Sequence, residues 1–365
     1  MKKEEKKKKV YVGMSGGVDS SVAAGLLKKS GYEVLGVHLV CFKGNIQGCS
    51  ADEDRIEAER AAAALGISFE IWDLEKEYRK KVLNYMIDGY KKGETPNPDV
   101  ECNKEIKFGI FFERAIKQGA DYVATGHYAR LLKREGVYKL LAGKDKEKDQ
   151  SYFLWNLNQK KLAKILFPVG GMLKSEVRKE AKKMRLPNAE KKDSQGLCFI
   201  GKVDFQDFLK NKIKEKEGII KDTEGNILGK HKGIFYYTIG QRKNIGFLGG
   251  GGEPYYVVEK KIKKNELIVS RRGEKEGSAL GVNLRAVNFI SQKAKKKSFD
   301  GKIKIRVRYR GKLSEAKIKK VIGKRAEIVF LKPVEFVAMG QSLVAYRGEK
   351  ELLFGGEISA IHRFF

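Results

Sequence analysis

The chain has 365 residues, of which 41% are hydrophobic and 33% charged, as expected for a globular protein of two or three domains. No apolar run approaches the roughly 20 residues of a membrane span, and residues 1–9 are lysine-rich without the apolar core of a signal peptide. We therefore expect a cytoplasmic protein with no membrane partner. Its 76 Lys and Arg against 46 Asp and Glu give a net charge of +30, which favours a polyanionic partner without identifying one.

Residues 10–21 read Val-Tyr-Val-Gly-Met-Ser-Gly-Gly-Val-Asp-Ser-Ser and precede an Ala- and Leu-rich run. This order predicts a strand, a tight loop and a helix. Backbone N–H groups at the start of such a helix, with the hydroxyls of Ser15, Ser20 and Ser21, can bind phosphate oxygens. The loop lacks the Gly-Lys-Ser/Thr ending of a Walker A motif. A glycine turn without a ligand is the plainer alternative, but the string is long and unusual for a turn alone.

From residue 10 to about residue 207 the pattern alternates between strands and helices, which predicts a parallel sheet covered by helices on both faces. The further predicted strands span residues 32–40, 68–74 and 120–125, and the predicted helices span residues 54–65 and 77–90. Ligands of such sheets bind beyond the carboxyl ends of the strands. We therefore expect the glycine-rich loop, Leu39 and the Gly126-His127 pair to meet at one edge.

The pattern changes to short strands after about residue 210. We predict an N-terminal domain over residues 1–210, a small and mostly β central domain over 211–280, and a C-terminal β-barrel over 281–365. Within the barrel, residues 302–310 alternate between basic and apolar side chains, which predicts a strand with one basic face. That face is either simply solvated or a surface for a phosphate backbone.

Two of the four cysteines, Cys102 and Cys198, lie in sequences that suggest reactivity, and the wide spacing of all four excludes a disulfide framework. Cys102 follows Thr-Pro-Asn-Pro-Asp and precedes a helix predicted to begin at Asn103, which would place the thiol at a helix N-terminus near lysines. Asp99 could move a proton. From spacing alone, a packed cysteine fits Cys102 as well as a reactive one.

Cys198 lies in Lys-Lys-Asp-Ser-Gln-Gly-Leu-Cys-Phe-Ile-Gly, residues 191–201. A thiol in a glycine-punctuated loop beside lysines is accessible and electropositive, which suits a nucleophile or a sulfur carrier. The glycine-rich loop resembles the pyrophosphate-binding loop of the ATP pyrophosphatase superfamily. Together with the two thiols, this resemblance suggests that ATP activates a carbonyl oxygen and that sulfur, carried as a persulfide, replaces it.

These motifs together resemble those of the tRNA-specific 2-thiouridylases, the MnmA family, within the ATP pyrophosphatase (PP-loop) superfamily. Further matching stretches are Ala-Thr-Gly-His-Tyr, Lys-Asp-Gln-Ser-Tyr-Phe-Leu, Phe-Pro-Val-Gly, Thr-Ile-Gly-Gln-Arg-Lys, Arg-Tyr-Arg and Gly-Gln-Ser, so the resemblance covers nearly the whole chain. It implies an α/β, parallel-sheet PP-loop domain of the adenine nucleotide α-hydrolase type, followed by the small central domain and the β-barrel.

The resemblance also implies roles for individual residues. ATP would be bound by Gly13, Met14, Ser15, Gly16, Gly17, Val18, Asp19 and Ser20, with Leu39 and Gly126 on the adenine side, although the family often has Met where Leu39 stands. Cys102 would be the first catalytic cysteine, Cys198 the persulfide carrier and Asp99 the acid/base. Asn97, Pro98 and Asp99 would face a flipped target uridine, and tRNA would contact His127, Lys148, Asp149, Gln150, Tyr309, Arg310 and Gln341. Cys41 and Cys49 receive no role.

The implied reaction is adenylation of the C2 oxygen of the wobble uridine in tRNAs of the Glu, Gln and Lys type. The persulfide sulfur on Cys198 then attacks C2 and expels AMP, and Cys102 either forms a Cys102–Cys198 disulfide or reduces the persulfide to sulfide. Mg2+ would accompany ATP, and a cysteine desulfurase or a relay protein would load Cys198. Extruding a base costs less from a single-stranded loop, which fits an anticodon target.

Three alternatives remain at this point. An ATP pyrophosphatase acting on a small molecule would need neither a basic β-barrel nor paired cysteines. A basic RNA-binding protein with a relict nucleotide loop would not need Asp19, Ser20, Cys102 and Cys198. An iron–sulfur cluster held by Asp99, Cys102 and Cys198 could deliver sulfide in place of the persulfide.

Overall fold

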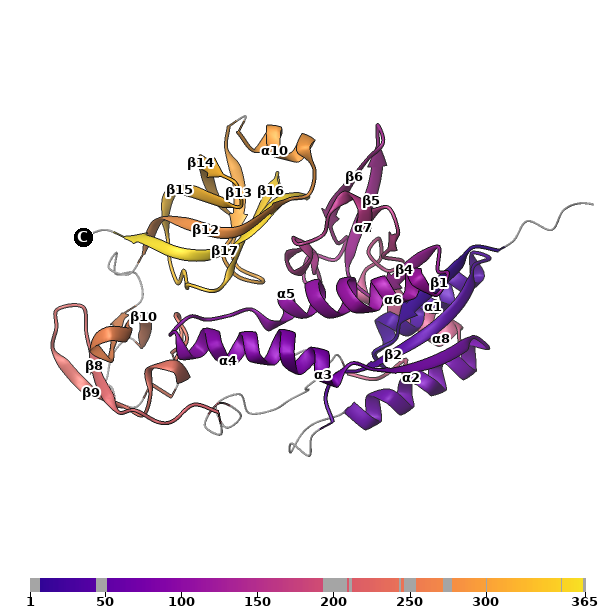
Figure 1. Cartoon of the computed structure of the whole chain (residues 1–365), viewed down its shortest axis with the longest axis horizontal. Coiled ribbons are helices and arrows are strands. Elements are labelled where there is room, and N and C mark those ends of the chain that lie inside the picture. Colours follow the sequence, from indigo (N-terminus) through magenta and orange to yellow (C-terminus); the bar gives the residue numbers. More distant parts are fainter. Residues whose placement is uncertain are drawn as a thin grey trace, which may run out of the picture.

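The computed structural model describes residues 7–43, 51–192, 209, 212–242, 244–245, 254–271, 278–299, 301–348 and 350–363. An α/β unit comes first in the chain, followed by a small β-sheet and then by a β-barrel (Figure 1). This order of architectures confirms the predicted fold class.

The α/β unit is built on a five-stranded sheet in the order β3-β2-β1-β4-β7, and all of its pairings are parallel. Its strands are β1 (Lys9–Gly13), β2 (Glu33–Val40), β3 (Ser68–Asp73), β4 (Tyr122–Thr125) and β7 (Ile165–Leu166). The first four are the predicted strands, and β7 is an additional strand of two residues that the sequence analysis did not identify.

Helices cover both faces of this sheet because side chains alternate along each strand. Val10 and Val12 of β1 pack in one buried cluster with side chains of α1 (Val18–Lys29), α2 (Ala51–Leu65) and α8 (Lys174–Lys183). Tyr11, which lies between the two valines, packs in a second cluster on the other face.

Two long helical segments run next to each other and form the cover of that second face (Figure 1). The first comprises α3 (Glu75–Tyr78), the π-helical η1 (Arg79–Leu83) and α4 (Asn84–Lys91). The second comprises α5 (Pro98–Cys102), the π-helical η2 (Asn103–Phe111) and α6 (Phe112–Lys117). The helix predicted to begin at Asn103 therefore begins at Pro98. Asn97 caps it and Pro98 takes the first helical position, which suits a residue without an N–H.

A β-hairpin that the sequence analysis missed projects from the α/β unit toward the barrel. Its strands β5 (Ala129–Arg134) and β6 (Val137–Ala142) pair along their whole length, and β6 also pairs with a barrel strand through Leu141 and Glu351. The chain then returns through η3 (Ser151–Leu154) and α7 (Gln159–Leu162) to the sheet. The hairpin thus joins the first unit to the third.

The small sheet has the order β10-β11-β8-β9. Its strands are β8 (Gly218–Lys221), β9 (Ile227–His231), β10 (Tyr255–Lys261) and β11 (Glu266–Arg271), with short 3-10 turns η4 (Ile234–Tyr236) and η5 (Ile262–Lys264). A turn joins β8 to β9, where Asn226 N donates to the Asp222 carboxylate at 2.8 Å and Gly225 has a φ of +97°. The glycine-rich residues 249–252 lie outside the described residues.

The barrel closes because its first strand pairs with its last. Its order is β12-β15-β14-β13-β16-β17, with β17 paired back to β12, and α10 (Gln292–Phe299) follows β12. The strands are β12 (Ala279–Phe289), β13 (Ile303–Arg306), β14 (Ser314–Ile322), β15 (Arg325–Val334), β16 (Ser342–Arg347) and β17 (Glu351–Arg363).

The strand predicted over residues 302–310 is shorter than expected. Ile303, Ile305 and Val307 are buried, as the alternation predicts, but β13 ends at Arg306 and the chain turns at Arg310, whose φ is +56°. The predicted basic face therefore covers only part of this segment.

Candidate active site

The glycine-rich loop lies between β1 and α1, at the carboxyl edge of the sheet. Gly16 has a φ of +78°, and a Cβ at this position would lie 2.2 Å from the backbone oxygen of Asp54. Gly126, after β4, approaches as closely, since a Cβ there would lie 2.6 Å from the backbone nitrogen of Ser20. The structure thus brings the loop and Gly126 together, and only glycine fits either position.

Serine hydroxyls hold the loop in this shape. Ser20 Oγ accepts a hydrogen bond from Ser15 N at 3.2 Å and donates to Gly17 O at 3.0 Å. Gly17 occupies the N-cap position of α1 and provides no side-chain cap for the helix. The first N–H groups of α1 therefore have no side-chain cap and could bind an anion such as a phosphate group. Residues 13–20 are called the phosphate cradle below.

Asp19 lies in the first turn of α1 and is neutralised by a residue distant in sequence. Its Oδ1 accepts a hydrogen bond from Lys174 Nζ at 2.6 Å and another from the Tyr128 hydroxyl at 2.8 Å. The Lys174 side chain is 13% exposed, so this ion pair is largely shielded from water. Lys174 places a positive charge beside the phosphate cradle.

Strand β2 supports the other side of the loop. Met14 N donates to Val37 O at 2.8 Å, and the Met14 carbonyl oxygen lies 2.9 Å from His38 Nδ1. Burial lowers the pKa of His38, and its hydrogen bond to Met14 opposes this shift. Leu39, the residue predicted on the adenine side, is buried at the end of β2.

The segment before the Cys198 motif is attached to the same loop. Asn188 Nδ2 donates to Gly16 O at 3.0 Å and to Ser21 Oγ at 2.9 Å, and Lys191 Nζ lies 2.6 Å from Asp54 Oδ1. Cys198 and Cys49 lie outside the described residues. Before this motif, the described residues end at residue 192.

Asn97, Asp99 and Cys102 come from the start of α5. Asn97 Oδ1 accepts a hydrogen bond from Val100 N at 3.2 Å, and the Asn97 side chain also hydrogen-bonds the Tyr152 hydroxyl. Pro98 and Asp99 are partly exposed, whereas Cys102 is 0% exposed. Because α5 begins at Pro98, the predicted placement of Cys102 at the very start of a helix is wrong: the cysteine lies in the second turn.

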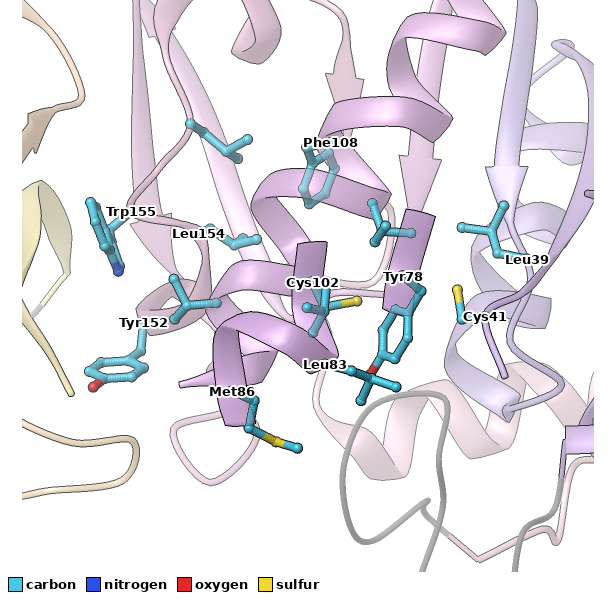
Figure 2. Close-up of a cluster of buried hydrophobic side chains, with 14 of the residues drawn as sticks. Leu39, Cys41, Tyr78, Leu83, Met86, Cys102, Phe108, Tyr152, Leu154 and Trp155 are labelled. Atoms are coloured by element: carbon cyan, nitrogen blue, oxygen red, sulfur yellow. The ribbon is translucent and has the colours of Figure 1, made fainter. Parts of the chain in front are cut away.

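The Cys102 side chain belongs to the large apolar cluster beneath the two helical segments. Figure 2 shows Cys102 and Cys41 in this cluster, with the ring of Tyr78 between them in the view. Lys104, a lysine close to Cys102 in the sequence, pairs with Glu101 at 2.9 Å and with Glu105 at 3.0 Å. Cys102 therefore lies in an apolar environment. For its thiol to react, part of the apolar cluster around it has to move.

The predicted tRNA-contacting residues from the α/β unit have partners within the protein. His127 is 6% exposed, packs against the rings of Phe108 and Phe167, and has its Nδ1 2.7 Å from Thr125 Oγ1. Burial lowers the pKa of His127 well below 6.5, and Lys107 lowers it further. Gln150 accepts a hydrogen bond from Tyr128 N at 3.0 Å.

Asp149 is joined to the barrel by an ion pair. Its Oδ2 lies 3.0 Å from Arg306 Nη1, while its Oδ1 accepts from Gly143 N and Ser151 N, each at 3.0 Å. Lys148, on the neighbouring position, is partly exposed. Arg306 is one of the basic side chains that the alternation assigned to a solvated or phosphate-binding face, and it serves instead as a partner for Asp149.

Tyr309, Arg310 and Gln341 reach from the barrel toward the α/β unit. The Tyr309 ring lies 4.4 Å from that of Phe153, and Arg310 Nη2 donates to Glu147 O at 3.0 Å. Gln341 Nε2 donates to Thr95 O at 2.9 Å. Gln341 thus contacts the segment that leads to Asn97, whereas Tyr309 and Arg310 contact the stretch around Lys148, Asp149 and Gln150.

Sequence reasoning missed three residues that shape this site: Lys174, Asn188 and Arg306. Lys174 and Asn188 contact the glycine-rich loop from 155 and 172 residues along the chain, and no local pattern signals such contacts. The period-two pattern identified Arg306 only as basic. Its partner could be found only from the fold.

Neither a metal cluster nor a membrane helix is evident in the part of the chain that the structure describes. No group of three or more His, Cys, Asp or Glu side chains there could hold a metal ion, and Cys198, which the iron–sulfur hypothesis requires, is not among these residues. None of the described helices is long and apolar enough to cross a membrane.

Comparison with protein families divides the chain into three matched regions. Residues 8–202 match the tRNA methyl transferase HUP domain, residues 206–271 the tRNA methyl transferase PRC-barrel domain, and residues 281–358 the aminomethyltransferase β-barrel domain. Among solved structures, a U34-tRNA thiolase NcsA from Methanococcus maripaludis is 21% identical over 57% of this chain and 68% of its own, with a TM-score of 0.35, which is too low to support a conclusion.

Curated relatives match over the full length. A tRNA-specific 2-thiouridylase MnmA of Geobacillus thermodenitrificans is 44% identical over 367 residues, covering 100% of this chain and 98% of its own. One from Shouchella clausii is 44% identical over 366 residues, covering 100% of this chain and 99% of its own. With similarity of this extent over all three matched regions, the chain belongs to the tRNA-specific 2-thiouridylase (MnmA) family of enzymes.

Proposed function

We propose that the protein uses ATP to replace the C2 oxygen of the wobble uridine of a tRNA with sulfur, giving 2-thiouridine. The observation that carries this proposal is the 44% identity, over the whole chain, to proteins named tRNA-specific 2-thiouridylases. The phosphate cradle and α5 with its N-cap Asn97 support it, because they bring a candidate phosphate site and a candidate thiol into one α/β unit.

In this proposal the ATP phosphates lie on residues 13–20, with Leu39 and Gly126 beside the adenine. Adenylation turns the C2 oxygen into a leaving group, and Asp99 serves as the acid/base. Mg2+ accompanies ATP, and the Asp19 carboxylate is an oxygen ligand of the kind that this ion prefers. Lys174 is placed to balance the charge of the carboxylate or of a phosphate.

Cys198 carries the incoming sulfur as a persulfide, loaded by a cysteine desulfurase or a relay protein. Its terminal sulfur attacks C2 and AMP leaves, which joins C2 to Cys198 through an S–S bond. The Cys102 thiolate then attacks Cys198 Sγ, so that a Cys102–Cys198 disulfide forms, the S–S bond to the base breaks and the sulfur stays on C2. Alternatively, Cys102 attacks the Cys198 persulfide first, which forms the same disulfide and releases sulfide, and the sulfide attacks C2 and expels AMP. Since Cys102 is 0% exposed, binding of the substrate has to displace part of the apolar cover around it. An iron–sulfur cluster on Asp99, Cys102 and Cys198 is the alternative route for sulfide.

The tRNA, of the Glu, Gln or Lys type, lies across the junction of the three proposed domains, residues 1–210, 211–280 and 281–365. Three barrel residues support this placement: Gln341 contacts Thr95, just before α5, while Tyr309 and Arg310 contact Phe153 and Glu147, which flank Lys148 in the chain. His127 and Asp149 act within the protein in this structure, so their contact with tRNA requires rearrangement.

Nucleoside mass spectrometry of unmodified tRNA incubated with ATP, Mg2+ and a persulfide donor tests the proposal. The expected product is 2-thiouridine, whereas a methylated nucleoside formed with a methyl donor, as the family descriptions would suggest, would overturn the assignment. Full activity of an anaerobically purified sample without bound iron would exclude the cluster route.

A further inference from the structure

Five buried side-chain atoms have no hydrogen-bond partner among the described residues. They are Thr95 Oγ1, Asn103 Oδ1, Asn188 Oδ1, His231 Nδ1 and Arg306 Nε. Buried polar groups in folded proteins are nearly always paired, so each of these atoms needs an explanation. Thr95 and Asn103 belong to the stretch that also holds Asn97, Asp99 and Cys102, which makes the proposed target-base site the place to look for a missing partner.

Asn103 is 5% exposed, and its amide orientation is fixed by a contact within the helix. Its Nδ2 donates to the backbone oxygen of Asp99 at 2.9 Å. Exchanging the two ends of the amide would set two oxygens against each other, so the atom without a partner is the oxygen. The site therefore contains a fixed acceptor that lacks a donor.

Asn103 shares a helix face with the proposed catalytic residues. Asp99, Cys102 and Asn103 are at positions i, i+3 and i+4, which are neighbours on a helix surface. The π-helical stretch η2 begins at Asn103, directly after Cys102. Such stretches are frequent at functional sites.

Asn97, the other asparagine of this stretch, differs from Asn103 in its hydrogen bonds. Its oxygen accepts from Val100 N at 3.2 Å and its side chain also hydrogen-bonds the Tyr152 hydroxyl, so both ends of its amide are used within the protein. Of the two amides, the one at Asn103 has the acceptor left for a ligand.

We propose that Asn103 Oδ1 accepts a hydrogen bond from N3–H of the target uracil and thereby selects uridine over cytidine. This inference rests on the proposed function. The N3–H group is the donor on the pairing edge of uracil and lies next to C2, the atom at which sulfur enters. Cytosine has a lone pair at N3, so two acceptors would face each other and cytosine would be rejected.

The size of the effect follows from the cost of a buried polar group without its partner. A site built to hydrogen-bond its substrate discriminates strongly against an analogue that lacks the group. Loss of one such bond in a buried site corresponds to a change of roughly 10- to 100-fold in kcat/KM. N3-methyluridine removes the donor and keeps the rest of the uracil ring.

The test uses anticodon stem-loop RNAs with uridine, N3-methyluridine or cytidine at the wobble position, and measures both binding and thiolation. The wild-type protein is expected to prefer uridine by roughly 10- to 100-fold or more. Asn103→Ala is expected to bring the ratio of uridine to N3-methyluridine close to one. Asn103→Asp, which keeps an acceptor, is expected to retain the preference even if its rate is lower.

Asn288→Ala serves as the matched control, because the Asn288 amide donates to the backbone oxygens of Trp155 and Leu157 at 2.7 and 3.0 Å and to no residue of the stretch 95–103. This control variant is expected to change the binding and thiolation of all three RNAs by the same factor, so that the preference for uridine stays as in the wild type. If Asn103→Ala keeps the wild-type ratio, the inference is wrong while the proposed function stands. If the wild-type protein thiolates none of the RNAs and no full-length tRNA, the proposed function itself fails.

Discussion

Gln341 Nε2 lies 2.9 Å from the backbone oxygen of Thr95, so a side chain of the barrel holds the segment that leads into α5. Thr95 N also donates to Met339 O at 2.7 Å. Through these two bonds the barrel fixes the chain two residues before Asn97. The barrel therefore positions the proposed target-base site as well as offering a surface for tRNA.

Replacing Gln341 by Ala should loosen this attachment. Loss of one such hydrogen bond costs about 0.5–1.5 kcal/mol of unfolding free energy, and we expect a several-fold lower kcat/KM for tRNA with unchanged affinity for ATP. Steady-state thiolation and calorimetric ATP binding measure the two effects. Gln292→Ala, at the exposed start of α10, is the control. Equal kinetics of both variants would show that the Gln341 bond does not position the site.

Gly16 and Gly31 provide a matched pair for the phosphate cradle. Both have positive φ, +78° and +86°, but a Cβ at Gly16 would lie 2.2 Å from Asp54 O, whereas a Cβ at Gly31 has nothing within 4 Å. Gly16→Ala should abolish measurable ATP binding, because the loop has to move. Gly31→Ala should cost only the backbone strain, about 1 kcal/mol, and bind ATP normally. Calorimetry with ATP would contradict the account if Gly16→Ala bound ATP like the wild type.

The Asp149–Arg306 pair should contribute strongly to the attachment of the barrel. The side chains are 4% and 19% exposed, and removing one partner of such a buried pair costs about 3–5 kcal/mol. Asp149→Ala should therefore lower the denaturant midpoint markedly. Glu190→Ala, which breaks a pair with Lys182 whose side chains are 76% and 62% exposed, should change stability by less than about 1 kcal/mol. Similar midpoints for both variants would refute this assignment.

Stability should fall in mild acid, in part because of His127. Burial keeps its pKa well below 6.5 in the folded protein, whereas the unfolded chain binds a proton near that pH. The unfolded state thus binds more protons below pH 6.5, so stability is complete above this pH and is lost as the pH falls. His127→Asn should make the pH dependence shallower by up to about 1.4 kcal/mol per pH unit. Chemical unfolding between pH 7 and pH 5 measures both slopes, and equal slopes would contradict this prediction.

The parts of the fold that sequence predicts well are those with local causes. Short apolar runs, β-branched and aromatic in β1, predicted β1 to β4, and the glycines near Gly16 predicted the loop, because both depend on neighbouring residues. The start of α5 was also readable, since Asn97 is a good N-cap and Pro98 suits the first helical position, but the helix was placed five residues late. The β5–β6 hairpin was missed because charged residues interrupt its alternation.

The remaining features depend on long-range contacts. The burial of Cys102 results from packing among helices and loops spread over the α/β unit, and Asp19 meets Lys174 across 155 residues of sequence. Asn103 looked like an ordinary helix residue. Only the hydrogen bonds of the folded chain reveal that its oxygen has no partner among the described residues.

The most direct test of the whole account compares the wild-type protein, Cys198→Ser and Cys41→Ser in thiolation of unmodified tRNA, read by nucleoside mass spectrometry. Cys41 is 2% exposed in the same cluster as Cys102 and controls for the loss of a cysteine as such. We predict 2-thiouridine from the wild type and from Cys41→Ser, and none from Cys198→Ser. Wild-type levels of 2-thiouridine from Cys198→Ser would contradict the proposed sulfur transfer.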